Sequence, residues 1–130
     1  MEVDEIPAIR IGIVGDCGVG KSMLASQLSG DFITTAMYSP TTGCGSHVEM
    51  FTDIQSGQCF FVVLYDIGGN PRFASSQSVF FNDFDGIMFV WDCSSEYTFH
   101  SIETWISEIK VSFRLSYYYV CSLVVLIICC

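Results

Sequence analysis

The sequence predicts an α/β fold, in which a mostly parallel sheet carries helices on both faces and forms three layers. Three observations favour it. Short apolar runs, typical of strands buried on both faces, alternate along the chain with segments of helical periodicity. A glycine-rich loop separates the first such run from the first helical segment. The 130 residues match one ordinary domain, and 51% of them are hydrophobic, which allows a sizeable core.

The first half of the chain is expected to form a strand, a helix and a hairpin. The strand is expected over Ile9–Val14 and the helix over Lys21–Leu28. His47–Thr52 is expected to be an edge strand that pairs antiparallel with Cys59–Tyr65 through the turn Gln55–Gly57. The hairpin would therefore lie at one edge of the sheet.

The second half adds a central strand and a longer helix. Cys59–Tyr65 and Gly86–Asp92 are continuous apolar runs, so both are expected to be strands buried on both faces. Tyr97–Lys110 is expected to be helical, because its apolar residues recur at steps of three and four. This apolar stripe is assigned to the core and comprises Phe99, Ile102, Trp105, Ile106 and Ile109. The solvent side comprises Glu103, Glu108 and Lys110.

Composition divides the chain into an acidic segment at residues 1–7, a domain at 8–110 and an apolar tail at 111–130. The tail has two structural interpretations. Val120–Ile128 is expected to be a fifth parallel strand, or the uncharged stretch Leu115–Cys130 is a short membrane anchor. As a helix that stretch would be about 24 Å long, which is short of a hydrocarbon core of about 30 Å.

Charge and cysteine content exclude several classes of protein. Fourteen acidic residues face only five basic ones, so there is no basic stripe for nucleic acid. The seven cysteines are odd in number and irregularly spaced, and no Cys-x-x-Cys pair occurs. This argues against both a disulfide scaffold and a structural zinc site. Reduced thiols and a cytoplasmic location are expected, because residues 1–7 lack the apolar core of a signal peptide.

The segment Gly15–Ser22 fits the pattern Gly-x-x-x-x-Gly-Lys-Ser/Thr, the phosphate-binding loop of nucleoside triphosphatases. Its glycines allow successive backbone N–H groups to converge on phosphate oxygens. Lys21 adds a positive charge at the outer phosphates, and the Ser22 hydroxyl can coordinate Mg²⁺. The loop lies between an expected strand and a helix N-terminus, where the helix dipole favours an anion.

Two further segments are compatible with the same chemistry. Asp66-Ile67-Gly68-Gly69 follows directly on an apolar strand, where a carboxylate would hold Mg²⁺ and Gly69 would let the backbone approach a terminal phosphate. Between this segment and the loop lies Pro40-Thr41-Thr42-Gly43, in which a threonine hydroxyl could complete the metal shell. In isolation, the latter would be interpreted as a plain turn.

Together, these motifs resemble those of Rab-type or Rab-like small GTPases of the Ras superfamily. Gly15–Ser22 is similar to the first family motif, and Pro40–Gly43 to the switch I segment. Tyr65–Phe73 resembles the Trp-Asp-Thr-Ala-Gly-Gln-Glu-Arg-Phe block of switch II. Phe80-Phe81, Gly86-Ile87, Val90–Asp92 and Ser101–Ile109 follow the Rab pattern in order, so the resemblance covers Ile9 to about Lys110.

The resemblance implies a set of binding residues and two cofactors, GTP or GDP and Mg²⁺. The residues implied to contact the nucleotide are Gly15, Cys17, Gly18, Val19, Gly20, Lys21, Ser22, Met23, Phe32, Tyr38, Thr41, Asp66 and Gly69. Ser22, Thr41 and Asp66 would surround the metal. Lys21, Thr41 and Asn70 would be the catalytic residues. Guanine nucleotide, effectors and regulators are the implied partners, with the switch segments as the protein-binding surface.

The chain departs from the family at two places. Asn70 stands where the family has the glutamine that orients the attacking water, and its amide falls roughly 1.5 Å short. Misplacement of about 1 Å can lower a rate by a factor of order 100, so slow hydrolysis is expected. The second departure is that no Asn-Lys-x-Asp motif for guanine follows Lys110. We expect a domain truncated before that motif, lacking the last strand and helix, with guanine selectivity in doubt.

The terminal Cys129-Cys130 resembles the di-cysteine that Rab proteins carry for prenylation, but an apolar run precedes it in place of a polar tail. An accidental ending, or an alternative gene product joined after Lys110, is a further interpretation. Membrane association through the tail, at the cytosolic face, and a dimer that covers the exposed sheet edge both remain open.

Three functions compete at this stage. The first is a GTP/GDP switch of the Rab kind, acting in membrane traffic or signalling. The second is an interaction or scaffold protein that binds nucleotide poorly. The third is a nucleotide or small-molecule kinase, which the three arginines in the chain disfavour, because such enzymes usually clamp two phosphorylated ligands with several.

Overall fold

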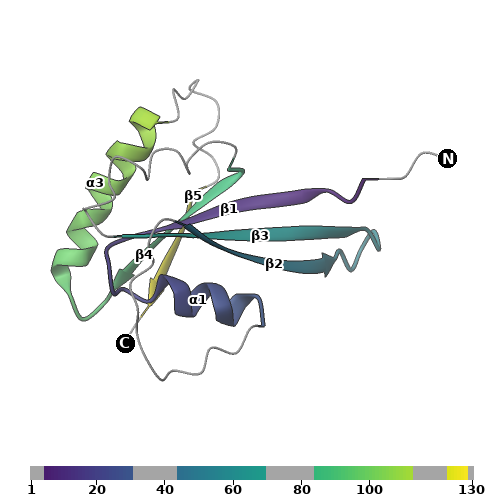
Figure 1. Cartoon of the computed structure of the whole chain (residues 1–130), viewed down its shortest axis with the longest axis horizontal. Coiled ribbons are helices and arrows are strands. Elements are labelled where there is room, and N and C mark those ends of the chain that lie inside the picture. Colours follow the sequence, from purple (N-terminus) through teal and green to yellow (C-terminus); the bar gives the residue numbers. More distant parts are fainter. Residues whose placement is uncertain (1–4, 31–43, 70–83, 113–122, 129–130) are drawn as a thin grey trace.

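The computed structural model describes residues 5–30, 44–69, 84–112 and 123–128 (Figure 1). These residues form a five-stranded sheet with the strand order β2-β3-β1-β4-β5, together with two helices. In chain order the elements are β1 (Ala8–Val14), α1 (Lys21–Leu28), β2 (Cys44–Thr52), β3 (Cys59–Ile67), β4 (Gly86–Asp92), α3 (Glu96–Ser112) and β5 (Leu123–Ile128).

The sheet is parallel except at one edge. β1 lies between β3 and β4 and runs parallel to both, while β2 pairs antiparallel with β3. This confirms the predicted α/β fold with its hairpin at one edge. β5 pairs parallel with β4, from Ile87 opposite Leu123 to Asp92 opposite Ile128. The part of the tail that the structure describes is therefore a fifth strand, as one of the two interpretations expected.

The two helices cover opposite faces of the sheet (Figure 1). On one face, α3 packs against side chains that point toward it from β1, β3 and β4, namely Val14, Ile67, Ile87, Phe89 and Trp91. On the other face, α1 contributes Ala25 to a second cluster that includes Ile13, Leu64, Met88 and Val90. Successive residues such as Ile13 and Val14 thus belong to different clusters, which is the period-two alternation of a strand buried on both faces.

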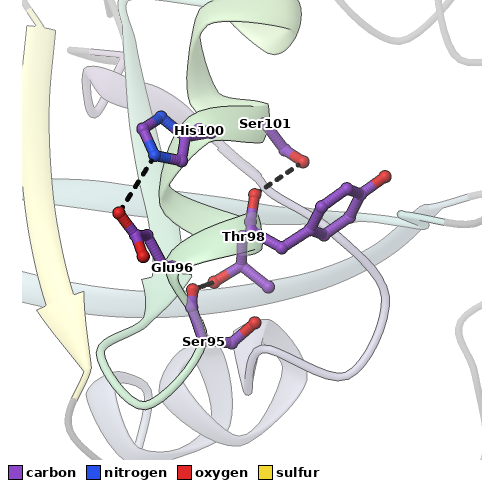
Figure 2. A network of polar contacts seen from close by, with 6 residues as sticks. Ser95, Glu96, Thr98, His100 and Ser101 are labelled. Atoms are coloured by element: carbon purple, nitrogen blue, oxygen red, sulfur yellow. Dashed lines mark hydrogen bonds and ion pairs between the residues drawn. The ribbon is translucent and has the colours of Figure 1, made fainter.

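The start of α3 is fixed by hydroxyl groups. Thr98 Oγ1 donates to the carbonyl of Ser95 at 2.8 Å and accepts a hydrogen bond from the backbone N–H of Asp92 at 3.0 Å. Figure 2 shows this turn together with the exposed pair Glu96–His100, in which the carboxylate and the imidazole lie 3.4 Å apart. The hydrogen bonds of Thr98 thus tie the first turn of α3 to the end of β4.

Two expectations about burial were wrong. Phe99 was assigned to the core stripe of its helix but is 51% exposed, because it contacts the edge of Trp91 at the end of β4 and not the interior. β3 was expected to be buried on both faces, yet only Leu64, Asp66 and Ile67 are buried. Residues Cys59–Val63 are half-buried and pair with Val48–Thr52 of β2, which are exposed.

No helix within the described residues is both long and apolar enough to cross a membrane. The cysteines within the same ranges, Cys17, Cys44, Cys59 and Cys93, form no disulfide.

Candidate functional site

The candidate site lies where β1 ends and α1 begins. The loop between them is pressed against β4, because a Cβ on Gly15 would lie 2.2 Å from the carbonyl oxygen of Val90. Gly15 also has a φ of +154°, a conformation that side chains rarely adopt. Only glycine fits at this position, and its presence lets the loop turn directly into the helix N-terminus.

Lys21, the first residue of α1, is folded into the loop. Its side chain is 6% exposed, and its ammonium group donates a hydrogen bond to the carbonyl oxygen of Asp16 at 2.8 Å. Burial lowers the pKa of Lys21, and the charges of Asp66, Cys17 and Asp16 oppose that shift. The structure therefore holds a buried cation at the position where the sequence motif predicts a phosphate-binding charge.

Ser22 and Asp66 are in contact at the edge of the sheet where the parallel strands end. The Ser22 hydroxyl donates a hydrogen bond to Asp66 Oδ2, which joins the start of α1 to the end of β3. Asp66 is 3% exposed. This contact joins two of the three residues expected around Mg²⁺.

Gly69 closes the other side of the loop. A Cβ on Gly69 would lie 2.4 Å from the carbonyl oxygen of Gly15 and 2.6 Å from both the carbonyl carbon of Asp16 and the nitrogen of Cys17. All three are backbone atoms, so no side-chain movement could make room. The segment after β3 therefore touches the phosphate loop main chain to main chain, while the contact expected between Gly69 and a terminal phosphate stays a prediction.

The donor set at this site fits a magnesium ion. Mg²⁺ prefers oxygen ligands, and it is commonly held by one or two carboxylates together with phosphate oxygens and waters. Ser22 and Asp66 supply a hydroxyl and a carboxylate that are already in contact. Within the described ranges, no group of three or more His, Cys, Asp or Glu side chains could hold a metal on its own. A metal held by Ser22 and Asp66 would take further oxygen ligands, such as the phosphates of a bound nucleotide and the predicted ligand Thr41.

One contact at the site was missed by the sequence reasoning. Trp105 Nε1 in α3 donates a hydrogen bond to Asp16 Oδ1 at 2.9 Å. Asp16 had no assigned role, and Trp105 was read only as part of an apolar stripe. The available signal was the indole itself, since a buried Trp N–H usually needs an acceptor.

Several predicted site residues lie outside the described residues: Phe32, Tyr38, Thr41 and Asn70. The others occupy the loop or its surroundings. Val19, Lys21 and Asp66 are buried, while Cys17, Gly18 and Met23 are exposed. The two halves of the predicted site, Gly15–Met23 and Asp66–Gly69, are thus brought together, and their nucleotide-binding roles remain predictions.

Comparison with known proteins identifies the family to which the chain is similar. A family model described as "Ras of Complex, Roc, domain of DAPkinase" matches residues 10–126, which extends the resemblance beyond Lys110 and through most of β5. Two proteins of Arabidopsis thaliana are similar to the chain: "Small GTPase-like protein LIP2" is 32% identical over 120 residues, and "Small GTPase LIP1" is 34% identical over 116. These matches cover 83% and 80% of this chain but 35% and 33% of the two relatives.

A relative named as a Rab protein has a similar identity and is likewise covered only in part. "Ras-related protein RABD2a" of Arabidopsis thaliana is 32% identical over 100 residues, covering 77% of this chain and 48% of that protein. The chain thus spans between a third and about half the length of these relatives. The family model nevertheless covers nearly the whole chain, and the phosphate loop, the Ser22–Asp66 contact and the sheet order agree with it. The chain belongs to the Ras superfamily of GTPase domains.

Proposed function

We propose that this domain binds GDP and GTP together with Mg²⁺ at the phosphate loop. The observation that carries the proposal is the hydrogen bond between Ser22 and Asp66, next to the buried ammonium of Lys21. This places a hydroxyl, a carboxylate and a positive charge at one helix N-terminus, which is the combination that a metal-bound polyphosphate needs. Ser22 and Asp66 would hold the metal, and Lys21 would neutralise the outer phosphates. The bound metal would supply charge stabilisation at the transferring phosphate.

We further propose that the domain acts as a switch of the Rab kind in membrane traffic or signalling, in the cytoplasm or at the cytosolic face of membranes. Contacts between the γ-phosphate and the segments that contain Thr41 and Gly69 would hold these segments in one arrangement, which effectors and regulators would bind.

Hydrolysis of GTP would be slow because of Asn70. Asn70→Gln lengthens the side chain by one methylene, so it should raise the single-turnover rate of GTP hydrolysis by tenfold or more. An unchanged rate would remove Asn70 from the mechanism.

Equilibrium binding tests the proposal directly. Fluorescent GDP, GTP and ATP analogues are titrated into the 130-residue chain with Mg²⁺ and with excess EDTA. We expect guanine-selective binding that weakens when EDTA removes the metal. Ser22→Ala should weaken binding in Mg²⁺ by about tenfold or more, because the metal loses one ligand. Ser26→Ala is the matched control, since Ser26 is a buried serine in the same helix and its hydroxyl has no hydrogen-bond partner within the described part of the chain.

A second candidate function is supported by a different surface. Exposed apolar side chains gather on the hairpin: Val48 is 56% exposed, Met50 54% and Ile54 98%. On the other face of the same hairpin, because successive residues of β2 point to opposite faces, a cavity of about 350 Å³ has a lining that is apolar apart from Ser29, His47 and Glu49. An interaction protein with little affinity for nucleotide would use such a surface. A folded sample that binds none of the three nucleotides would favour this function over the switch.

A further inference from the structure

The hydrogen bond from Trp105 to Asp16 connects the buried face of α3 to the phosphate loop, and the two residues are 89 positions apart in the sequence. Trp105 is 6% exposed and belongs to the cluster that holds α3 against the sheet. Asp16 is the second residue of the loop. A buried indole N–H needs one acceptor, and a backbone carbonyl would suffice. Here the acceptor is instead a carboxylate inside the segment that would surround the phosphates.

Asp16 is held from three directions. Its side chain accepts the hydrogen bond from Trp105, and its carbonyl oxygen accepts one from Lys21 at 2.8 Å. Its peptide link to Cys17 is covered by Gly69, which approaches too closely for any Cβ. The conformation of this residue therefore depends on α3, on α1 and on the segment after β3 together.

The charge of Asp16 gives the contact a consequence for ligand binding. A carboxylate in a phosphate-binding loop carries the same sign as the ligand, so its direction matters. The contact with Trp105 directs it toward α3. The second oxygen, Oδ2, is buried and accepts no hydrogen bond from the residues that the structure describes. The indole N–H is thus the side-chain donor that holds this carboxylate in place.

We propose that Trp105 is a positioning residue for the phosphate loop, which acts by holding the Asp16 carboxylate against α3 and away from the phosphates. The inference rests on the proposed function, because its main effect is on affinity for a nucleotide. It goes beyond that function by assigning a binding role to a residue that touches neither the nucleotide nor the metal ligands.

The test combines Trp105→Phe with Asp16→Asn. Trp105→Phe keeps an aromatic ring in the core and removes the N–H, so the carboxylate is free to turn toward the phosphates. We expect the Kd for GDP in Mg²⁺ to rise about tenfold, because a carboxylate turned toward the phosphates repels them. Adding Asp16→Asn should return the Kd to within about threefold of wild type, because a neutral amide does not repel phosphate.

The matched control is Trp91→Phe. Trp91 is the other tryptophan of the chain, is 8% exposed and belongs to the same cluster, so the substitution removes the same atoms. The Kd of the Trp91→Phe variant for GDP should stay within about twofold of wild type. If Trp105 acted only through packing, Trp105→Phe would lower the melting temperature and Asp16→Asn would not restore binding. That result, or an unchanged Kd in Trp105→Phe, would overturn the proposal.

A measurement on the nucleotide-free protein separates this inference from the proposed function. Wild-type protein that fails to bind GDP would refute the function, and the positioning role is then decided by alkylation of Cys17, the exposed residue after Asp16. We expect iodoacetamide to modify Cys17 several-fold faster in Trp105→Phe than in wild type, measured by peptide mass spectrometry. Cys93, also exposed, is the internal reference. Equal rates at Cys17 in the two proteins would overturn the positioning role.

Discussion

The two ends of the sheet differ in how closely the backbone is packed. At the loop end, β1 and β3 end in buried residues, β4 is buried as far as Trp91, and the glycines at 15 and 69 leave no space for a Cβ. At the hairpin end, the end of β2 and the start of β1 are exposed, the start of β3 is half-buried, and a Cβ on Gly57 would meet nothing within 4 Å. Both ends are rich in apolar residues. The proposed nucleotide site thus lies at the end of the sheet where main chains are in the closest contact.

The largest expected effect contrasts two phenylalanines from the two ends. Phe89 is 1% exposed in β4, and Phe51 is 43% exposed in β2. Phe89→Ala should lower the free energy of unfolding by about 3–5 kcal/mol, because it leaves a cavity between α3 and the sheet. Phe51→Ala should lower it by less than about 1 kcal/mol. Urea denaturation of the two variants measures both values, and equal losses would remove the distinction between the ends.

Two glycine substitutions sharpen the same comparison for binding. Gly69→Ala forces a Cβ onto three backbone atoms of the loop, so the loop or the segment after β3 must move. We expect the Kd for GDP to rise about 100-fold, in line with the cost of a displacement of about 1 Å at a site of this kind. Gly57→Ala meets no atom but keeps a φ of +73°, so it should cost about 1–2 kcal/mol of stability and leave the Kd unchanged. Tight GDP binding by Gly69→Ala would contradict the assigned contact.

The lowered pKa of Lys21 predicts a pH dependence at the loop end. Burial makes its ammonium lose a proton below the ordinary pKa of 10.5. Bound phosphate favours the charged form, so affinity for GDP is complete below the pKa of the free protein and falls as the pH rises through it. The Kd is measured from about pH 7 to about pH 10. Lys21→Arg, which stays charged, should bind more weakly at neutral pH but show no such fall; a parallel fall in that variant would assign the titration to another group.

The smallest effect concerns a thiol at the border of the two ends. Burial and the charge of Asp66 raise the pKa of Cys44 to about 11. Its thiolate fraction at about pH 8 is then on the order of one in a thousand, so it should react more slowly with iodoacetamide than Cys59, which is also half-buried. Asp66→Asn should speed the reaction at Cys44 and leave Cys59 unchanged. Identical behaviour of both thiols would contradict the raised pKa of Cys44.

Local signals explain what the sequence could predict. The bounds of α1 and β4 were predicted as observed, because glycine marks the start of each segment and the apolar run is continuous. The contact between Ser22 and Asp66 was foreseeable, since Ser22 follows β1, Asp66 lies at the end of β3, and parallel strands end at the same edge of a sheet. These features depend on neighbouring residues or on a rule of topology.

The misses depend on distant partners. A helical period identifies the stripe that contains Phe99 and Trp105, but it does not say where the covered part of the sheet ends or which buried group needs a polar partner. Phe99 therefore proved exposed, and Trp105 proved to donate to a loop far away in sequence. The burial of β3 was overestimated for a related reason, because a continuous apolar run predicts a strand but does not say how far helices cover its two faces.

The release of GDP tests the central claim most directly. Fluorescent GDP is loaded onto the 130-residue chain in Mg²⁺, and its dissociation rate is measured before and after excess EDTA. We expect EDTA to speed release by at least about tenfold in wild type and in Ser26→Ala, and to have little further effect in Ser22→Ala, where one metal ligand is already missing. An equal response to EDTA in Ser22→Ala and wild type, or no GDP retained by the folded chain, would contradict a magnesium-dependent nucleotide site at Ser22 and Asp66.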